Sequence, residues 1–374
     1  MPISTQKQPF LAKFTYSLII IIGLGFLFFI GQNIISPLLI ALLFAILLRP
    51  VVSFLNVKLH IPNVIASLFT VLLFSLLFVG IFYFISTQIA IMADDWGKIK
   101  SNLAIHYDNI QSYISETFNF SRREQNKIVK DAASGSQDTG KQIIGITLLS
   151  FTDALLSIIL VPLYMFLILL YRTHFKIFLC KLFDEKHHVK LRDILNTIKI
   201  SVQSYLLGLL FELLIVSGLT ALGLWIIGVK YAILLGIITG LLNLIPYIGI
   251  LIAGLLSIIA SLTGTADLSI IIGIIIVNVV VQLIDNNLLV PLVVSSKVEI
   301  NSIATIVGII IAGAVAGISG MFLAIPLMAI LKVIFDRVEP LEAWGYLLGD
   351  DLPKSFNWKK SKTVAAVPKT PKTE

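Results

Sequence analysis

The sequence is poor in the residues that stabilise or activate soluble proteins. Its 374 residues include a single cysteine, Cys180, which excludes an intramolecular disulfide framework and a metal site built from several cysteines. Only 13% of the residues are charged, whereas 57% are hydrophobic, and a typical soluble domain carries about twice that share of charge. A water-soluble globular protein is therefore excluded, and an integral membrane protein is predicted.

Short motifs of the common soluble enzymes are also missing. The chain has no H-E-x-x-H metalloprotease motif and no complete G-x-x-x-x-G-K-[ST] phosphate-binding loop. His187 and His188 are adjacent but have no third histidine at helical ligand spacing, so we interpret them as surface residues. We expect no enzyme activity, no cofactor and no metal site, and transport would be driven by gradients rather than by ATP.

The apolar residues form separate runs of 18 or more, each long enough for an α-helix to cross a bilayer. This pattern predicts an all-α, polytopic protein with about eight membrane segments. Residues 1–86 are predicted to hold three transmembrane helices, at about 14–30, 34–54 and 65–85. Because basic residues flank the first helix and the link near Lys58, we expect the N-terminus and that link to be cytoplasmic.

The polar stretches alternate with the remaining crossings. Residues 87–145 are predicted to form an extracytoplasmic helical excursion, since residues 87–141 carry seven basic and seven acidic side chains. A fourth crossing at 146–171 leads to a cytoplasmic amphipathic linker at 172–201, where residues 172–199 carry seven basic against three acidic side chains. The formal charge of +7 is thus interpreted as loop charge that sets orientation, and no nucleic-acid partner is expected.

Residues 202–337 are predicted to be the transport region because they contain two long interrupted apolar segments. The first, 231–264, would span about 51 Å as one helix, and Pro246 and Gly249 interrupt it. The second, 301–331, contains a set of possible break points: Gly313, Gly317, Gly320 and Pro326. Broken backbone in a membrane must line a cavity or pack inside protein. Either each segment crosses once, or each is a re-entrant hairpin of an inverted repeat.

Charged and amide side chains at membrane depth identify the candidate site. Glu212 and Asp285 lie inside apolar segments, where a carboxyl group is costly and is often functional. We predict that this pair couples transport to a proton or cation. The predicted substrate path comprises Asn243, Tyr247, Gln282, Asn286 and Asn287. The alternative role for all these residues is hydrogen bonding that holds helices together.

Three ordered motifs make the chain recognisable: Asn243–Gly249 (NLIPYIG), Gln282–Pro291 (QLIDNNLLVP) and Gly317–Pro326 (GISGMFLAIP). In these motifs the chain resembles the autoinducer-2 exporter (AI-2E) family, also called PerM-like permeases, over about residues 10–340. The resemblance implies a bacterial inner-membrane permease that forms a homo-oligomer. Relatives are credited with exporting autoinducer-2 or with exchanging Na⁺ or Li⁺ for protons. The chain departs from many relatives at Ile250, where they have a second proline, and at Asn301–Ser302, where they often have His-Pro.

The sequence therefore predicts a gradient-driven secondary transporter that exports a small polar solute, such as autoinducer-2, or exchanges Na⁺ or Li⁺ for H⁺. The alternative is a passive oligomeric pore or a membrane scaffold without coupled transport. Residues 338–374 carry many lysines and three prolines after residue 351, and are expected to form a partly disordered cytoplasmic tail.

Overall fold

The computed structural model describes residues 10–118, 137–245, 248–261, 263, 267–295 and 300–350. Six of the helices there are long and apolar enough to cross a membrane, and two shorter apolar helices accompany them. This confirms the predicted polytopic, all-helical membrane protein. The elements are α1 (Phe10–Lys58), α2 (Asn63–Asp94), α3 (Trp96–Phe118), α5 (Gln137–Leu182), η1 (Glu185–His187), α6 (His188–Ile226), α7 (Ala232–Asn243), α8 (Ile248–Ser261), α9 (Leu268–Ile284), the π-helix η2 (Asp285–Ser295), α10 (Ser302–Arg337), η3 (Glu339–Leu341) and α11 (Glu342–Leu348).

Several segments that the sequence predicts as separate elements are parts of one continuous helix in the structure. The first two predicted crossings form one helix, α1, which continues through Gly31 to Asn33. A glycine and two amides keep their backbone N–H groups, so they do not end a helix in an apolar run. In the same way α5 extends beyond the fourth crossing to Leu182, and α6 begins at His188, so the predicted linker is largely helical. Residues 119–136 of the predicted excursion and the tail from residue 351 lie outside the described residues.

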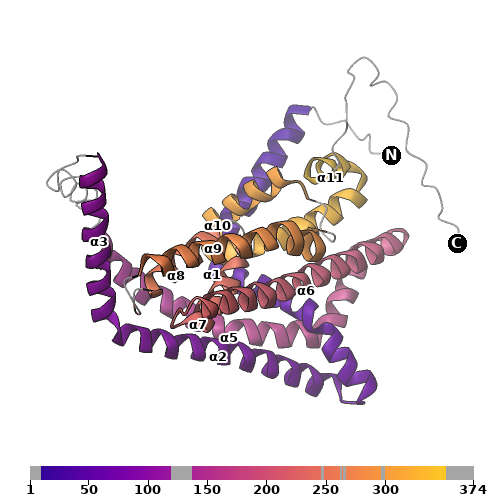
Figure 1. Cartoon of the computed structure of the whole chain (residues 1–374). Helices are drawn as coiled ribbons and strands as arrows, with labels where there is room; N and C mark the ends of the chain where they lie inside the picture. The colour runs from indigo at the N-terminus through magenta and orange to yellow at the C-terminus, as the bar shows by residue number, and fades with distance from the viewer. Residues whose placement is uncertain are drawn as a thin grey trace, which may run out of the picture.

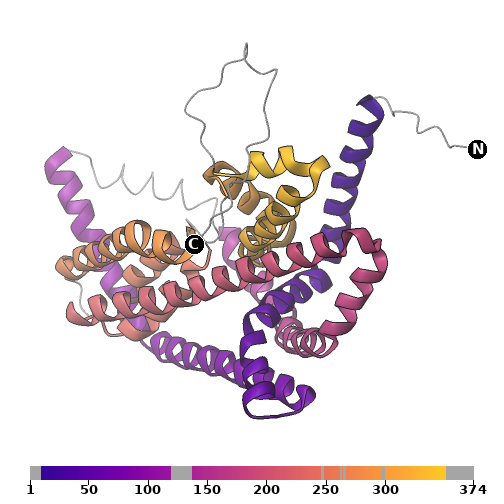
Figure 2. The ribbon, with the colours of Figure 1, turned by 90° about the vertical axis from the view of Figure 1, so that its right-hand side faces the viewer.

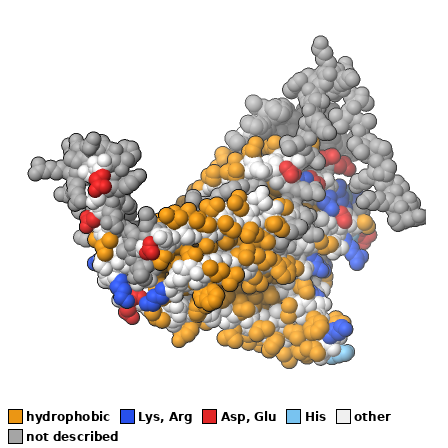
Figure 3. Space-filling view, viewed as in Figure 1, with side chains coloured by type: hydrophobic (Ala, Val, Ile, Leu, Met, Phe, Trp, Pro, Cys, Tyr) orange, Lys and Arg blue, Asp and Glu red, His pale blue; other side chains and the backbone are white. Residues whose placement is uncertain are grey.

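On the face shown in Figure 3, the exposed charged side chains gather at the two ends of the helical assembly. In Figure 3 hydrophobic side chains cover the middle of the visible face, and charged side chains gather toward α3 on one side and α11 on the other. We call these the α3 end and the α11 end. Figure 1 shows α2 and α6 running lengthwise between them. An apolar surface bounded by two charged ends is the form that a bilayer requires.

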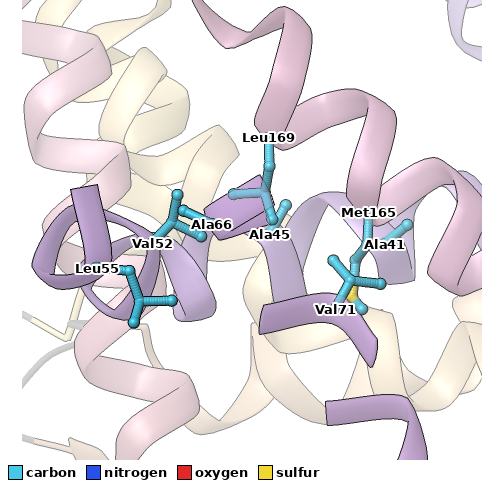
Figure 4. Close-up of a cluster of buried hydrophobic side chains, with 8 residues drawn as sticks. All are labelled: Ala41, Ala45, Val52, Leu55, Ala66, Val71, Met165 and Leu169. Atoms are coloured by element: carbon cyan, nitrogen blue, oxygen red, sulfur yellow. The ribbon is translucent and has the colours of Figure 1, made fainter. Parts of the chain in front are cut away.

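The helices α1, α2 and α5 pack closely through small side chains. Ala41 and Ala45 of α1 are buried against Met165 and Leu169 of α5, and Ala66 of α2 belongs to the same cluster (Figure 4). In lipid there is little hydrophobic drive between helices, so close contact between small residues stabilises them instead. This cluster forms one side of the protein, and it leaves the other side to α6 through α10 (Figure 2).

The first broken segment is a helical hairpin, which we call hairpin 1. Its helices α7 and α8 have 12 and 14 residues, about 18 and 21 Å, which is too short to cross about 30 Å of hydrocarbon. Ala232 at the start of α7 and Ala260 near the end of α8 belong to one buried cluster, so the two helices are antiparallel. At the tip, a Cβ on Gly249 would lie 1.8 Å from the carbonyl oxygen of Leu242. Pro246 and Tyr247 lie outside the described residues.

The second broken segment, α10, is one of the six long helices by length and composition, but it is not one straight span, because it folds back on itself. We call it hairpin 2. Its backbone leaves helical geometry at Ala316 (φ −138°, ψ 24°) and Gly317 (φ 57°, ψ −141°). A Cβ on Gly313 would contact Met321, and one on Gly320 would lie 1.9 Å from the carbonyl oxygen of Ala312. These contacts pair residues 312–313 with 320–321 and therefore place the arms 302–315 and 318–337 side by side.

Pro326 does not break the backbone, because the second arm of hairpin 2 continues through it to Arg337. Proline removes one backbone donor and leaves the helical φ intact, and membrane helices tolerate such a loss when neighbouring helices cover the freed carbonyl. The break in this segment is therefore made by glycine, at Gly317, whose positive φ a side chain would oppose.

The two hairpins open toward opposite ends. The base of hairpin 1 is at the α3 end, since the hydroxyl of Tyr231 donates to Asp95 between α2 and α3. The base of hairpin 2 is at the α11 end, since Asn301 bonds the backbone of α11. The tip of hairpin 1 packs against the middle of α6, where Leu244 shares a cluster with Leu323 of the second arm of hairpin 2. This antiparallel arrangement fits the hairpin form of the two that the sequence left open.

We predict that Gly317→Ala destabilises the protein by about 1–3 kcal/mol, because alanine opposes the positive φ of the hairpin 2 turn. The control is Gly254→Ala in α8, where a Cβ has open space and alanine favours the helix. Both are measured as unfolding in detergent. Equal stability of the two variants would show that the turn does not need glycine.

Candidate functional site

A buried polar cluster lies where three helices meet. The Asn243 side chain, at the end of α7, donates through Nδ2 to Glu212 Oε1 of α6 at 2.8 Å and to Asp285 Oδ2 at 3.2 Å. Asp285 is the first residue of the π-helix η2. One amide therefore joins two carboxyl groups that are 73 residues apart in the sequence. We call Glu212, Asn243 and Asp285 the carboxyl–amide cluster.

Glycines on α7 place Asn243 against Glu212. A Cβ on Gly240 would lie 2.0 Å from Ser217 Oγ and 2.7 Å from the carbonyl oxygen of Leu213, and one on Gly236 would lie 2.6 Å from the Ala221 Cβ. The backbones of α6 and α7 consequently approach more closely than side chains would allow. One turn beyond Gly240, this approach brings the Asn243 amide within hydrogen-bond distance of the Glu212 carboxyl group.

A change of helix type positions the other carboxyl group. The α-helix α9 ends at Ile284 and the chain continues as a π-helix of 11 residues from Asp285. π-Helices are rare and usually short, and they are frequent at functional sites. Around this change Asp285 is buried while Asn286 and Asn287 are exposed, so the carboxyl group and the two following amides lie on different faces.

The carboxyl groups are shielded from solvent and incompletely paired. Glu212 is 6% exposed and Asp285 is 4% exposed. Glu212 Oε2 and Asp285 Oδ1 accept no hydrogen bond from the residues that the structure describes, and neither carboxyl group forms an ion pair there. Two buried carboxylates cannot both keep a charge without a positive partner. The arrangement can therefore hold a proton or a small cation.

Part of the predicted substrate path lies elsewhere. Gln282 donates to Asn286 Oδ1 at 2.8 Å, and Asn287 donates to the carbonyl oxygen of Leu283, both within one helical segment. The structure therefore joins Asn243 to Glu212 and Asp285, but it does not bring Gln282, Asn286 or Asn287 to them. Tyr247 lies outside the described residues. Among the described residues there is also no cluster of three His, Cys, Asp or Glu suited to a metal ion.

Two polar contacts at the ends were missed by sequence reasoning. Asp95 accepts hydrogen bonds from Lys230 and Tyr231, more than 130 residues away, and from Lys98 at 2.9 Å. The Lys230 ammonium, followed by Lys98 and the Tyr231 hydroxyl, holds the pKa of Asp95 well below its ordinary value. The sequence did contain one indication of this contact, since Lys230 is a single charged residue between two apolar helices. Its partner could not be identified, because residue spacing carries no information about a contact so distant in the chain.

The second missed contact lies at the α11 end. Arg337 Nε donates to Asp193 Oδ2 at 2.7 Å, and its Nη2 donates to Thr197 Oγ1 at 3.0 Å. These bonds connect the end of hairpin 2 to the first turns of α6. In the sequence Asp193 contributes only to the charge balance of the predicted linker, because nothing local to it indicates a partner 144 residues away.

We predict that Asn243→Ala lowers the free energy of unfolding by about 1–3 kcal/mol, because two buried carboxyl groups lose their shared donor. The control is Asn278→Ala, whose half-buried amide bonds the carbonyl oxygen of Ile274 in its own helix. Both variants are compared with the wild type by thermal unfolding in detergent. A loss no larger than that of the control would mean that the amide does not hold the two carboxyl groups.

Comparison with known proteins agrees with this architecture. Residues 16–339 match the sequence profile described as "AI-2E family transporter". The chain is also similar to "Putative transport protein YueF" of Bacillus subtilis (strain 168), with 29% identity over 274 residues that cover 70% of this chain and 72% of YueF. The matched region includes all six long apolar helices and both hairpins. The chain is a membrane transporter, not an enzyme, and belongs to the AI-2E family.

Proposed function

We propose that the protein is a gradient-driven secondary transporter that exchanges a monovalent cation, Na⁺ or Li⁺, for protons at the carboxyl–amide cluster. The observation that carries this proposal is the pair of buried carboxyl groups on one amide, each with an oxygen that the described residues leave without a hydrogen-bond donor. In this proposal Glu212 and Asp285 bind the coupling ion, and the Asn243 amide holds their two carboxyl groups close together.

The chemistry of the cluster favours ion exchange. Its carboxyl groups supply oxygen, the ligand that hard cations prefer, and the same oxygens bind protons. A proton and a cation therefore compete for one site, and such competition produces exchange when the site faces one side of the membrane at a time and changes sides only with an ion bound. Export of a small polar solute, such as autoinducer-2, is the other substrate class, with the same carboxyl groups supplying the coupling proton.

Two opposed hairpins suit alternating access. Leu244 at the tip of hairpin 1 and Leu323 in the second arm of hairpin 2 pack in one cluster against α6, and the hairpin bases lie at opposite ends. Such inverted, broken elements around a midplane site are typical of secondary transporters. The proposed substrate path then includes Asn243 and, as the sequence predicts, Tyr247, which lies outside the described residues.

The charge distribution supports an orientation. The basic stretch 172–199 includes Asp193 and Thr197, which bond Arg337 at the α11 end. Under the rule that basic loops stay inside, the α11 end is cytoplasmic and the α3 end is extracytoplasmic. We accordingly place the chain in the bacterial inner membrane as a multi-pass protein with both termini in the cytoplasm.

A homo-oligomer accounts for the amides outside the cluster. Asn286 and Asn287 are exposed beside exposed Leu283 and Leu288, at a depth where an amide facing lipid is costly. A second copy packed on this face would hydrogen-bond them, as interhelical amides do in membranes. In that arrangement Gln282, Asn286 and Asn287 serve assembly rather than the substrate path.

The test of the function is proton movement in proteoliposomes with an imposed pH gradient. Addition of Na⁺ or Li⁺ is expected to collapse the gradient with wild-type protein, and Glu212→Gln and Asp285→Asn are expected to abolish this response. The control is Glu339→Gln, which makes the same change at an exposed site and should transport normally. Full cation response in both cluster variants would remove the carboxyl pair from the mechanism.

The alternative, a passive pore or scaffold, is tested by the concentration dependence of flux. A carrier must bind its ion in each cycle, so we expect the initial rate to saturate as the cation concentration rises. A rate that increases linearly to the highest concentration would indicate a pore, and no flux of any cation would direct the assay to a small polar solute such as autoinducer-2.

A further inference from the structure

The base of hairpin 1 is fixed to the corner between α2 and α3 by one carboxylate. Asp95 accepts from Lys230 and from the Tyr231 hydroxyl, the latter at 2.9 Å. The Lys230 ammonium also lies 5.1 Å from the centre of the Tyr231 ring, within cation–π range. Lys230 and Tyr231 directly precede α7, so any movement of hairpin 1 away from α2 and α3 must break these contacts.

The base of hairpin 2 is fixed to α6 by a second, independent contact. Arg337, the last residue of α10, bonds Asp193 at 2.7 Å and Thr197 at 3.0 Å. Both acceptors lie in the first turns of α6. Each hairpin therefore has one charged contact at its base that joins it to an element outside the hairpin, and the two contacts lie at opposite ends of the protein.

We propose that these contacts are the latches of two gates, with Asp95, Lys230 and Tyr231 closing the α3 end and Asp193, Thr197 and Arg337 closing the α11 end. This inference rests on the proposed function, because a transporter must open one end at a time. Hairpin 1 carries Asn243 of the carboxyl–amide cluster, and opening at its base leads along the α6–α7 contact toward that cluster.

The two latches are unequal. The Asp95 side chain is 13% exposed and accepts from two residues at the base of hairpin 1, Lys230 and Tyr231, whereas the Asp193 side chain is 63% exposed and accepts from Arg337. Solvent weakens the exposed ion pair more than the sheltered one. The structure thus has its firmer latch at the α3 end, and the α11-end latch is the one that opens more readily.

The test measures from which side a buried position can be labelled. The reporter is Ser217→Cys, because Ser217 lies on the face of α6 that packs against Gly240 of α7 and its Oγ is buried. The background carries Cys180→Ser, which removes the exposed native thiol. A membrane-impermeant maleimide is applied to full-length protein in proteoliposomes from each side in turn. Lys230→Met is expected to raise the labelling rate about tenfold from the α3 side only.

Two further variants separate a latch from general loosening. Lys98→Met removes a bond to the same carboxylate, but that bond links Asp95 only to the next turn of the chain, so labelling should stay at the starting rate. Arg337→Met should leave labelling from the α3 side unchanged. If Lys230→Met labels like the starting protein, or if labelling rises equally from both sides, the proposal is wrong.

Labelling also separates this inference from the transport proposal, because it needs no substrate. A wild type that moves no ion or solute, while Lys230→Met still opens the α3 side, would refute the proposed function and leave a hinged hairpin held by Asp95. Normal ion exchange by a Lys230→Met protein with unchanged labelling would refute the latch and leave the transporter. A melting temperature measured in detergent for each variant identifies any that is simply unfolded.

Discussion

The burial of two carboxyl groups on one amide is the constraint around which the rest of the structure is organised. Glu212 and Asp285 are buried within apolar helical segments, where an unpaired charge costs several kcal/mol. They are tolerated because Asn243 supplies a donor to both and because the surrounding helices exclude lipid. A proton or cation that neutralises the pair removes the unfavourable free energy of the buried charge. The burial of the two carboxyl groups therefore favours binding of such an ion.

The same constraint explains the glycines. An amide can reach both carboxyl groups only if α7 approaches α6 at backbone distance, which Gly236 and Gly240 permit. Hairpin tips also contain backbone N–H and C=O groups that have no hydrogen-bond partner within a helix. In a membrane such groups are tolerated only where they are buried in protein or line a water-filled cavity. Gly249 lets the tip of hairpin 1 pack tightly against the backbone of Leu242, and Gly317 supplies the positive φ of the hairpin 2 turn.

Much of the fold followed from the sequence, and the errors are instructive. Apolar runs predicted a polytopic helical protein, and glycine and proline located both broken segments. The predicted break after residue 30 was wrong because Gly31, Gln32 and Asn33 keep their backbone donors, so α1 continues through them. The prediction that Pro326 breaks its segment was also wrong, because the helix continues through it despite the loss of one backbone donor. Local chemistry marks where a chain can break, whereas packing decides where it does.

For the candidate site, the sequence by itself determined which side chains are too costly to be accidental: Glu212, Asp285 and the neighbouring amides stand in apolar runs. Only the tertiary structure decided that Asn243 joins the two carboxyl groups while Asn286 and Asn287 face outward. It alone paired Asp95 with Lys230 and Asp193 with Arg337. The physical reason is range: burial cost is a property of each residue in its own segment, but hydrogen-bond partners depend on which helices meet, and that is set by close packing between segments far apart in the chain.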